Sequence, residues 1–296
     1  MKDPLRLMCI LAHPDDESLG TGGILAKYAA EGVETYLVTA TRGERGWTGD
    51  PAANPGLTAL GQMREAELRA AAQVLGLREV AFLDYMDGDL DQADPVEAIA
   101  RIVDHLRRLR PQVVVTFGPD GNYGHPDHIA ISQFTTAAIV CAADPTYHLG
   151  TGEATGEEEY MALQPDLPVA SPLQAHRVTK LYYAVDSLML VEQARAVFGD
   201  LTFVVDGVER RWVAWEEWAV TTRIDATAHW RTVWQAILCH QSQIAGIQEK
   251  LSALPEEQHQ LFWGRQNLYR AFSLVNGGRQ VENDLFAGLR PHIERG

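Results

Sequence analysis

Residues 5–17 read LRLMCILAHPDDE, a short apolar run followed by a histidine, a proline and three successive carboxylates. The run at 5–11 is long enough for one strand that is buried on both faces of a sheet. Residues 18–31 then carry small and apolar side chains at helical spacing. The carboxylates therefore lie in a strand-to-helix turn, at the sheet edge where open α/β proteins bind ligands.

Strand and helix patterns alternate from this first strand to about residue 142. The expected strands are 33–39, 80–83 and 113–117, and the expected helices are 58–75, 95–109 and 126–141. This alternation predicts an α/β fold with a Rossmann-like, mostly parallel sheet and helices on both faces. A GxGxxG motif is absent from the first turn, and carboxylates stand where a pyrophosphate would need backbone amides. The sequence thus argues against dinucleotide binding.

The chain divides into three parts. Residues 1–143 are expected to form the Rossmann-like core. Residues 144–175 have no apolar period and predict a long loop or flap, for which an active-site lid is one hypothesis. Residues 176–296 predict an α+β extension whose strands and helices complete the same domain. Its expected elements are strands at 178–185 and 201–205, a helix at 187–198 and a long amphipathic helix at 226–251.

Trp212, Trp215 and Trp218 recur at every third residue. This spacing would place the indoles along one helical face or alternate them in a strand. We expect them to make core or subunit contacts.

Length and composition exclude several classes of protein. The 296 residues, 46% of them apolar, can bury a full core. The 25 basic and 40 acidic residues give a net charge of −15, which disfavours nucleic acid and anionic membranes as partners. Three widely spaced cysteines and the lack of a long apolar stretch predict a soluble protein of the cytoplasm. The oligomeric state is open, and a homo-oligomer is compatible with the sequence.

A second motif, GHPDH at 124–128, follows another expected strand, so two clusters share one edge of the sheet. A catalytic zinc site takes three protein ligands and leaves the fourth position for water. His13, Asp16 and His128 supply such a set, and Fe(II), Co(II) or Mn(II) would fit the same ligands. A cation there would relieve the clustered negative charge of the first motif.

The remaining motif residues suit acid–base chemistry. Asp15 is the candidate general base, because its carboxylate can take the proton of an activated water. His125 can donate a proton or a hydrogen bond to a carbonyl oxygen, with Asp127 orienting its ring. The alternative is that both motifs are simple helix starts with capping carboxylates. A cap needs only one carboxylate, so that alternative leaves the others unexplained.

Together, AHPDDE at 12–17 and GHPDH at 124–128 resemble the LmbE/PIG-L-like metal-dependent de-N-acetylases. The resemblance covers residues 5–142. It implies zinc ligands at His13, Asp16 and His128, a general base at Asp15 and an oxyanion-assisting histidine at His125.

Three further segments are similar to the mycothiol-pathway and bacillithiol-pathway branches of that family: TRGERGWTGD at 41–50, MREAEL at 63–68 and PDGNYGHPDH at 119–128. The likeness implies that Arg64 contacts substrate and that Tyr123 donates a hydrogen bond to the tetrahedral intermediate. Arg42 follows the second strand and is expected to line the pocket. His240, in AILCHQSQ, resembles a late histidine-glutamine pattern without an assigned role.

The expected function is that of a zinc-dependent hydrolase that removes acetate from an N-acetylglucosaminyl conjugate of the inositol or malate type. Its partner would be a small acetylated amino sugar. One alternative keeps the site and changes the amide, as in an amidase for a thiol conjugate or another N-acyl substrate. The other is a non-catalytic sugar- or nucleotide-binding Rossmann module, which predicts no stoichiometric metal and no hydrolysis.

Overall fold

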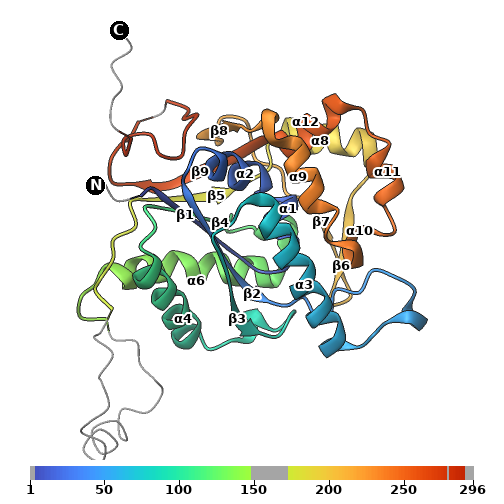
Figure 1. Cartoon of the computed structure of the whole chain (residues 1–296), viewed down its shortest axis with the longest axis horizontal. Helices are drawn as coiled ribbons and strands as arrows, with labels where there is room; N and C mark the ends of the chain where they lie inside the picture. The colour runs from blue at the N-terminus through green and yellow to red at the C-terminus, as the bar shows by residue number, and fades with distance from the viewer. Residues whose placement is uncertain (1–3, 148–172, 279, 291–296) are drawn as a thin grey trace, which may run out of the picture.

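Strand β1 (Arg6–Leu11) lies inside a seven-stranded sheet, and its residues from Leu7 onward have no exposed surface. The computed structural model describes residues 4–147, 173–278 and 280–290. In spatial order the sheet consists of β3 (Glu79–Tyr85), β2 (Glu34–Thr41), β1, β4 (Val113–Phe117), β5 (Lys180–Ala184), β9 (Arg265–Ser273) and β8 (Thr222–Asp225) (Figure 1).

Strands β1 to β5 pair in parallel, whereas β9 and β8 extend the sheet antiparallel beyond β5. Parallel strands need both faces covered, which explains why β1 and β4 are continuous apolar runs rather than alternating ones. The predicted α/β, Rossmann-like and mostly parallel fold is confirmed.

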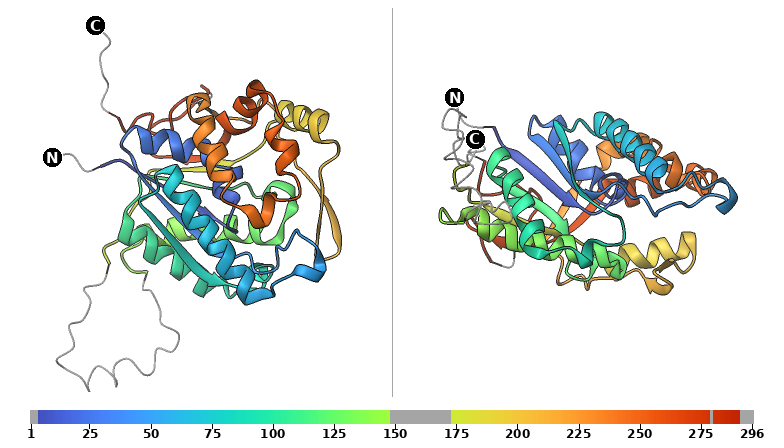
Figure 2. Two further views of the ribbon diagram at one scale, coloured as in Figure 1. Left: turned by 45° about the vertical axis from the view of Figure 1, so that its right-hand side comes forward. Right: turned by 90° about the horizontal axis from the view of Figure 1, so that it is seen from below.

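The helices that follow the parallel strands cover both faces of this sheet. They are α2 (Gly22–Ala30), α3 (Leu57–Leu75), α4 (Pro95–Leu109) and α6 (Pro126–Ala143). Helices α4 and α6 pack together on one face, while α2 and α3 lie on the other beside α9 (Trp230–Ile237) (Figure 2). Both α4 and α6 begin with proline after a capping side chain, Asp94 and His125 respectively.

The C-terminal part adds shorter elements around this framework. They are α8 (Leu188–Phe198), the hairpin of β6 (Thr202–Val205) and β7 (Val208–Arg211), and α12 (Glu256–Gly264). The strands expected at 178–185 and 201–205 and the helix at 187–198 match β5, β6 and α8 to within two residues. No helix among the described residues is long and apolar enough to cross a membrane. Most of the predicted flap, residues 148–172, lies outside the described residues.

The long helix predicted at 226–251 is wrong. The segment forms α9, α10 (Gln241–Ile244) and α11 (Gln248–Ser252), with turns between them. The helix ends before His240 because that side chain turns into the protein, where it is 1% exposed and pairs with Glu17. A tertiary contact between distant segments therefore overrides the local helical pattern.

The three tryptophans lie neither on one helical face nor along a regular strand. Trp212 and Trp215 follow β7 in an irregular segment, outside helix and strand. Their indole N–H groups donate to Asp186 and Asp120 at 2.5 and 2.7 Å. Trp218 is 85% exposed, so the expected core contact is wrong for this residue in the monomer.

A buried ionic cluster ties the C-terminal segment to the start of β5. Lys180 has no exposed surface, and its ammonium donates to Glu282 at 2.7 Å. Tyr182 and Thr222 donate to the other oxygen of the same carboxylate, at 2.8 and 3.0 Å. Arg270 lies 3.0 Å from it as well. Removing one member of such a cluster leaves the others buried and unpaired.

We expect Glu282→Gln to lower the free energy of unfolding by about 3 kcal/mol, because the buried Lys180 loses its counter-ion. Urea denaturation at pH 7 measures this difference. Burial alone would raise the pKa of Glu282, but Lys180 and the other donors lower it to about 2. The Glu282 carboxylate therefore makes its full contribution to the free energy of unfolding above the unfolded-state pKa of about 4.3. This contribution is lost as the pH falls towards 2. A difference in the free energy of unfolding between wild type and variant that stays constant from pH 7 to 3 would contradict this.

Candidate functional site

The two histidine motifs meet at the carboxyl edge of the parallel strands. His13 and Asp16 follow β1, where Asp16 begins the short helix α1 (Asp16–Leu19). His128 lies in the first turn of α6, after β4 and the irregular turn α5 (Gly121–Gly124). Because β1 and β4 are neighbours in the sheet, segments more than 100 residues apart are brought side by side.

Three potential ligand groups form a small triangle at this edge. His13 Nδ1 lies 3.1 Å from His128 Nε2, while the Asp16 oxygens lie 3.7 Å from the former and 3.5 Å from the latter. Metal–ligand bonds of about 2.0–2.1 Å in a tetrahedral zinc site place the ligand atoms roughly 3.3 Å apart. The His13–His128 and Asp16–His128 separations are close to this spacing, whereas the 3.7 Å separation is measured to the other Asp16 oxygen, which also accepts the backbone N–H of His13.

The other ring nitrogen of each histidine is within hydrogen-bond distance of a neighbouring residue. His128 Nδ1 lies 3.2 Å from the carbonyl oxygen of Gly121 and must donate to it. His13 Nε2 lies 3.1 Å from Asp87 and 3.2 Å from Asp127, both of which accept. When both rings are neutral, two lone pairs face each other at the triangle, and a cation between them would stabilise this arrangement. Without a cation, burial lowers the pKa of His13, but the contacts with Asp127 and Asp87 outweigh burial and raise it, so His13 carries the charge. These residues fit a metal ion.

Electrostatics also favours a cation here. Burial raises the pKa of Asp16 to about 7, although the charge of His13 acts in the opposite direction. Burial and the neighbouring charge of His13 lower the pKa of His128. A divalent cation would stabilise the ionised form of Asp16, and the neutral His128 imidazole offers it a lone pair. The two groups therefore form a suitable donor set for a cation.

Asp87 is a site residue that the sequence analysis missed. It follows β3, and its carboxylate contacts His13 Nε2 and accepts the backbone N–H of Arg45 at 3.0 Å. Burial would raise the pKa of Asp87, but the contact with His13 lowers it. The available signal was an aspartate just past an expected strand, on the same edge as the two motifs.

Asp127 orients a different ring from the one predicted. Its carboxylate contacts His13 and accepts the backbone N–H groups of Gly88 and Leu90, at 2.7 and 3.2 Å. The expected support of the His125 ring by this carboxylate is wrong, because the backbone N–H of Asp127 instead donates to His125 Nδ1 at 3.1 Å. Asp127 thereby links the loop that follows β3 to the first motif.

His125 lies beside the triangle with its ring 4.7 Å from that of His13 and 4.8 Å from that of His128. Burial and the charge of His13 lower its pKa to about 4. Since Nδ1 accepts the helix amide, the neutral ring carries its proton on Nε2. His125 is therefore a neutral hydrogen-bond donor near neutral pH.

Asp15 lies in an unusual turn, directly before the other two acidic residues of the motif. Its backbone has φ 118° and ψ −28°, and its side chain is 18% exposed. Burial raises the pKa of the carboxyl, although Arg64 opposes the shift. A partly exposed carboxylate with raised proton affinity, one residue from a metal-ligand candidate, suits a general base.

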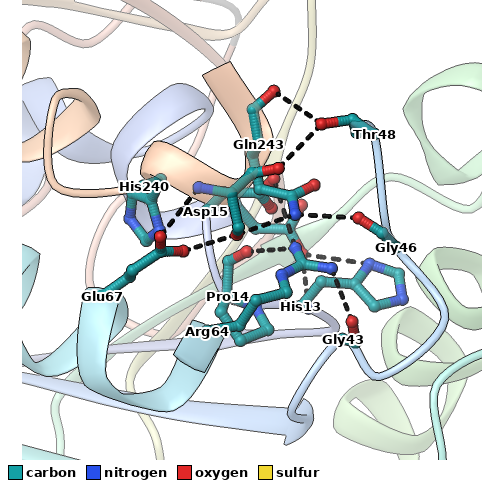
Figure 3. A network of polar contacts seen from close by, with 12 residues as sticks. His13, Pro14, Asp15, Gly43, Gly46, Thr48, Arg64, Glu67, His240 and Gln243 are labelled. Carbon is teal, nitrogen blue, oxygen red and sulfur yellow. Dashed lines mark hydrogen bonds and ion pairs between the residues drawn. The ribbon is translucent and has the colours of Figure 1, made fainter. Parts of the chain in front are cut away.

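Arg64 lies beneath this turn rather than open to a substrate. Its guanidinium donates to the carbonyl oxygens of Pro14 and Gly43 and lies 3.4 Å from the Asp15 carboxylate (Figure 3). The side chain is only 4% exposed. A Cβ at Gly43 or Gly46 would lie 2.2 Å from the guanidinium, which explains both glycines. Arg64 thus contacts the candidate base, and its contact with a substrate stays a prediction.

Tyr123 flanks the two histidines of the second motif. Its ring lies 5.7 Å from that of His125 and 5.2 Å from that of His128, and it stacks at 4.4 Å on Phe203 of β6. Arg210 of β7 donates to the carbonyl oxygen of Gly124. The β6–β7 hairpin, which no motif pointed to, therefore fixes the loop that carries Tyr123.

Arg42 lines a cavity of about 270 Å³ together with Glu44, Leu57, Thr58 and Met86, among others. Arg42 donates to Glu65 and Asp84, both at 2.6 Å, and is thereby held at the wall. Glu44 also accepts the backbone N–H of Asp87 at 3.3 Å, which connects the cavity wall to the His13 neighbourhood.

Comparison with protein families and named relatives gives consistent results. Residues 8–139 match the family model PIG-L, described as GlcNAc-PI de-N-acetylase. The chain is 32% identical to a 1D-myo-inositol 2-acetamido-2-deoxy-alpha-D-glucopyranoside deacetylase of Kineococcus radiotolerans, over 98% of this chain and 85% of the relative.

Solved structures show how widely the fold is used. The N,N'-diacetylchitobiose deacetylase of Pyrococcus horikoshii aligns with a TM-score of 0.62 at 18% identity, over 90% of this chain and 84% of its own. The 4-carboxy-2-hydroxymuconate hydratase GalB of Pseudomonas putida KT2440 aligns with a TM-score of 0.59 at 20% identity, over 93% and 99%. These likenesses concern the fold alone, since the two proteins catalyse different reactions.

Proposed function

The chain belongs to the LmbE/PIG-L family of de-N-acetylases, and from this premise we propose a metal-dependent hydrolase that removes acetate from an N-acetylglucosaminyl conjugate of inositol. The observation that carries the proposal is the triangle of His13, Asp16 and His128 with Asp15 in the adjacent position. We propose zinc as the metal, since two imidazoles and one carboxylate with an open position form a common catalytic zinc set.

A metal ion held by these residues would polarise the acetyl carbonyl and lower the pKa of the attacking water. The chain's own groups then handle the protons. Asp15 accepts a proton from the water as the new C–O bond forms. The Nε2–H of His125, with the hydroxyl of Tyr123, stabilises the charge that develops on the carbonyl oxygen. The proton held by Asp15 passes to the departing amine as the C–N bond breaks, which yields acetate and a free glucosamine.

The inositol assignment rests on relatives that cover nearly the whole chain and share the deacetylase name. The cavity beside Arg42 and Glu44 lies on the same sheet edge, where Thr58 adds a hydroxyl next to the apolar Leu57 and Met86. Arg42 would contribute by shaping this wall and binding the aglycone.

A panel of substrates tests the function. The purified chain, loaded with zinc, is given GlcNAc-inositol, GlcNAc-malate, N,N′-diacetylchitobiose and an N-acetylated thiol conjugate, and acetate release is measured. We expect kcat/KM for GlcNAc-inositol to exceed the others by about tenfold or more. Preferential cleavage of the thiol conjugate would favour the amidase alternative, and acetate release from none of them would overturn the proposal.

Asp87→Asn should weaken metal binding by about 10- to 100-fold, because the ring of His13 loses a carboxylate that orients it and raises its basicity. Competition with a fluorescent chelator measures the Kd of the ion. Asp89→Asn is the matched control, since that carboxylate lies two residues away, is half exposed and pairs with Arg45. Equal affinities for the two variants would exclude this role of Asp87.

A further inference from the structure

The segment 240–243, which reads HQSQ, contacts three separate parts of the site edge. His240 Nε2 lies 2.7 Å from Glu17, in the first motif. Ser242 donates to Glu67 of α3 through both its backbone N–H and its hydroxyl, at 2.8 and 2.6 Å. Gln243 donates to the carbonyl oxygen of Gly46 at 2.9 Å. We call this segment the brace; Figure 3 shows its His240 and Gln243 near Asp15 and Arg64.

The contact between His240 and Glu17 is fully buried. Glu17 has no exposed surface and His240 is 1% exposed. Burying a carboxylate and an imidazole is costly unless both are paired, so this pair needs a reason beyond filling the core. Neither residue belongs to the ligand triangle or donates to the reacting groups in the mechanism above.

Glu17 connects the brace to the candidate base. One of its oxygens accepts from His240, and the other accepts the backbone N–H of Asp15 at 3.0 Å. On the opposite side, Arg64 holds the carbonyl oxygen of Pro14. The Pro14–Asp15 peptide group is therefore fixed at both its N–H and its carbonyl oxygen by buried charged side chains.

Asp15 needs such restraint because its φ of 118° is unfavourable for any residue with a Cβ. Residues in sparsely populated backbone regions persist only where the surroundings over-determine them. A relaxed backbone at this position would rotate the carboxylate away from its place beside Asp16.

From this geometry we propose that the buried Glu17–His240 pair is a positioning device for the general base, holding Asp15 in its strained conformation during turnover. The inference rests on the proposed function, since it assigns the pair to the reaction in which Asp15 accepts a proton. It gives a role to the HQSQ motif and to the third carboxylate of AHPDDE.

The test compares His240→Leu with wild type in the zinc-loaded protein, using GlcNAc-inositol. We expect kcat to fall by about 10- to 100-fold, because small displacements of a catalytic group cost rate steeply. KM should change less than about twofold, and metal content should stay at one ion per chain. Glu17→Gln should keep kcat within about threefold of wild type, because its amide can accept the Asp15 N–H and still bond His240.

A double-mutant cycle separates positioning from general stability. In the Asp15→Asn background, His240→Leu should change the residual kcat by less than about threefold, since it acts through the missing carboxylate. His176→Leu is the matched control: His176 is 8% exposed, and its Nε2 lies 2.7 Å from the carbonyl oxygen of Pro111, away from the site. It should lower Tm and leave kcat unchanged. If His240→Leu does not fold, His240→Asn takes its place in the cycle.

Four outcomes would overturn the inference. These are an unchanged kcat in His240→Leu, loss of the metal in that variant, equal falls in kcat in both Asp15 backgrounds, and a rate loss in His176→Leu as large as in His240→Leu. Wild-type protein that releases no acetate from any substrate of the panel overturns the proposed function, and this inference with it. Active wild type with an insensitive His240→Leu overturns the inference alone.

Discussion

Asp15→Asn should lower kcat for acetate release by about 10²- to 10⁴-fold while the protein still binds one metal ion per chain. The amide has the size of the carboxylate and cannot accept the proton of the attacking water. The ligand triangle does not include Asp15, so metal content should be unaffected. Initial rates of acetate release, together with metal analysis of the same samples, measure both quantities.

Asp284→Asn provides the comparison for this experiment. Asp284 accepts from Tyr28 at 2.9 Å and pairs with Arg290. Its loss should change stability without affecting turnover. A kcat for Asp15→Asn within threefold of that of Asp284→Asn would show that another group takes the proton. Loss of metal from Asp15→Asn would place Asp15 among the ligands instead.

His128→Ala should reduce kcat/KM by about 10⁴-fold or more, because one third of the ligand triangle is lost and the metal with it. The ring is 2% exposed, and its Nε2 is 3.1 Å from His13 Nδ1, so its removal opens the ligand triangle. Metal analysis should find well under one ion per chain. Wild type stripped by a chelator should lose activity to the same degree and regain it when zinc is added.

The stripped protein also separates a metal requirement from a folding defect. Recovery of activity on adding zinc to wild type, with none in His128→Ala, is the expected pattern. Full activity in stripped wild type would exclude metal catalysis. A His128→Ala variant that binds one ion as tightly as wild type would remove His128 from the ligand set.

The N-terminal half of the fold was predictable because its elements are set by local patterns. Proline and a capping residue mark the starts of α4 and α6, and β4 is an uninterrupted apolar run. The helix expected at 18–31 breaks into α1 and α2 around Gly20 and Thr21, which the apolar stripe did not reveal. Farther along, the turn before α10 depends on the partner of His240, a residue more than 200 positions away.

The candidate site divides in a similar way. His13, Asp16 and His128 were found because each lies in a short motif at a strand end, and the structure brings the three together. Asp87 lies in no motif, and His240 lies in a pattern without an assigned role, far from the strand ends; both join the site through folding. Asp127 was placed in the site but assigned to the wrong ring, because spacing along the chain does not report which imidazole a carboxylate faces.

The left-handed backbone conformation of Asp15 lowers the stability of the protein at a position where the proposed reaction needs an acidic side chain. Glycine would satisfy a φ of 118° with no steric cost, so a chain selected for stability alone would place glycine there. An acidic side chain at this turn strains the backbone and lowers stability. Proteins retain such strain where the chemistry of the site requires it. Stabilising consensus designs of this chain should therefore leave the turn unchanged, since a more stable protein would be an inactive one.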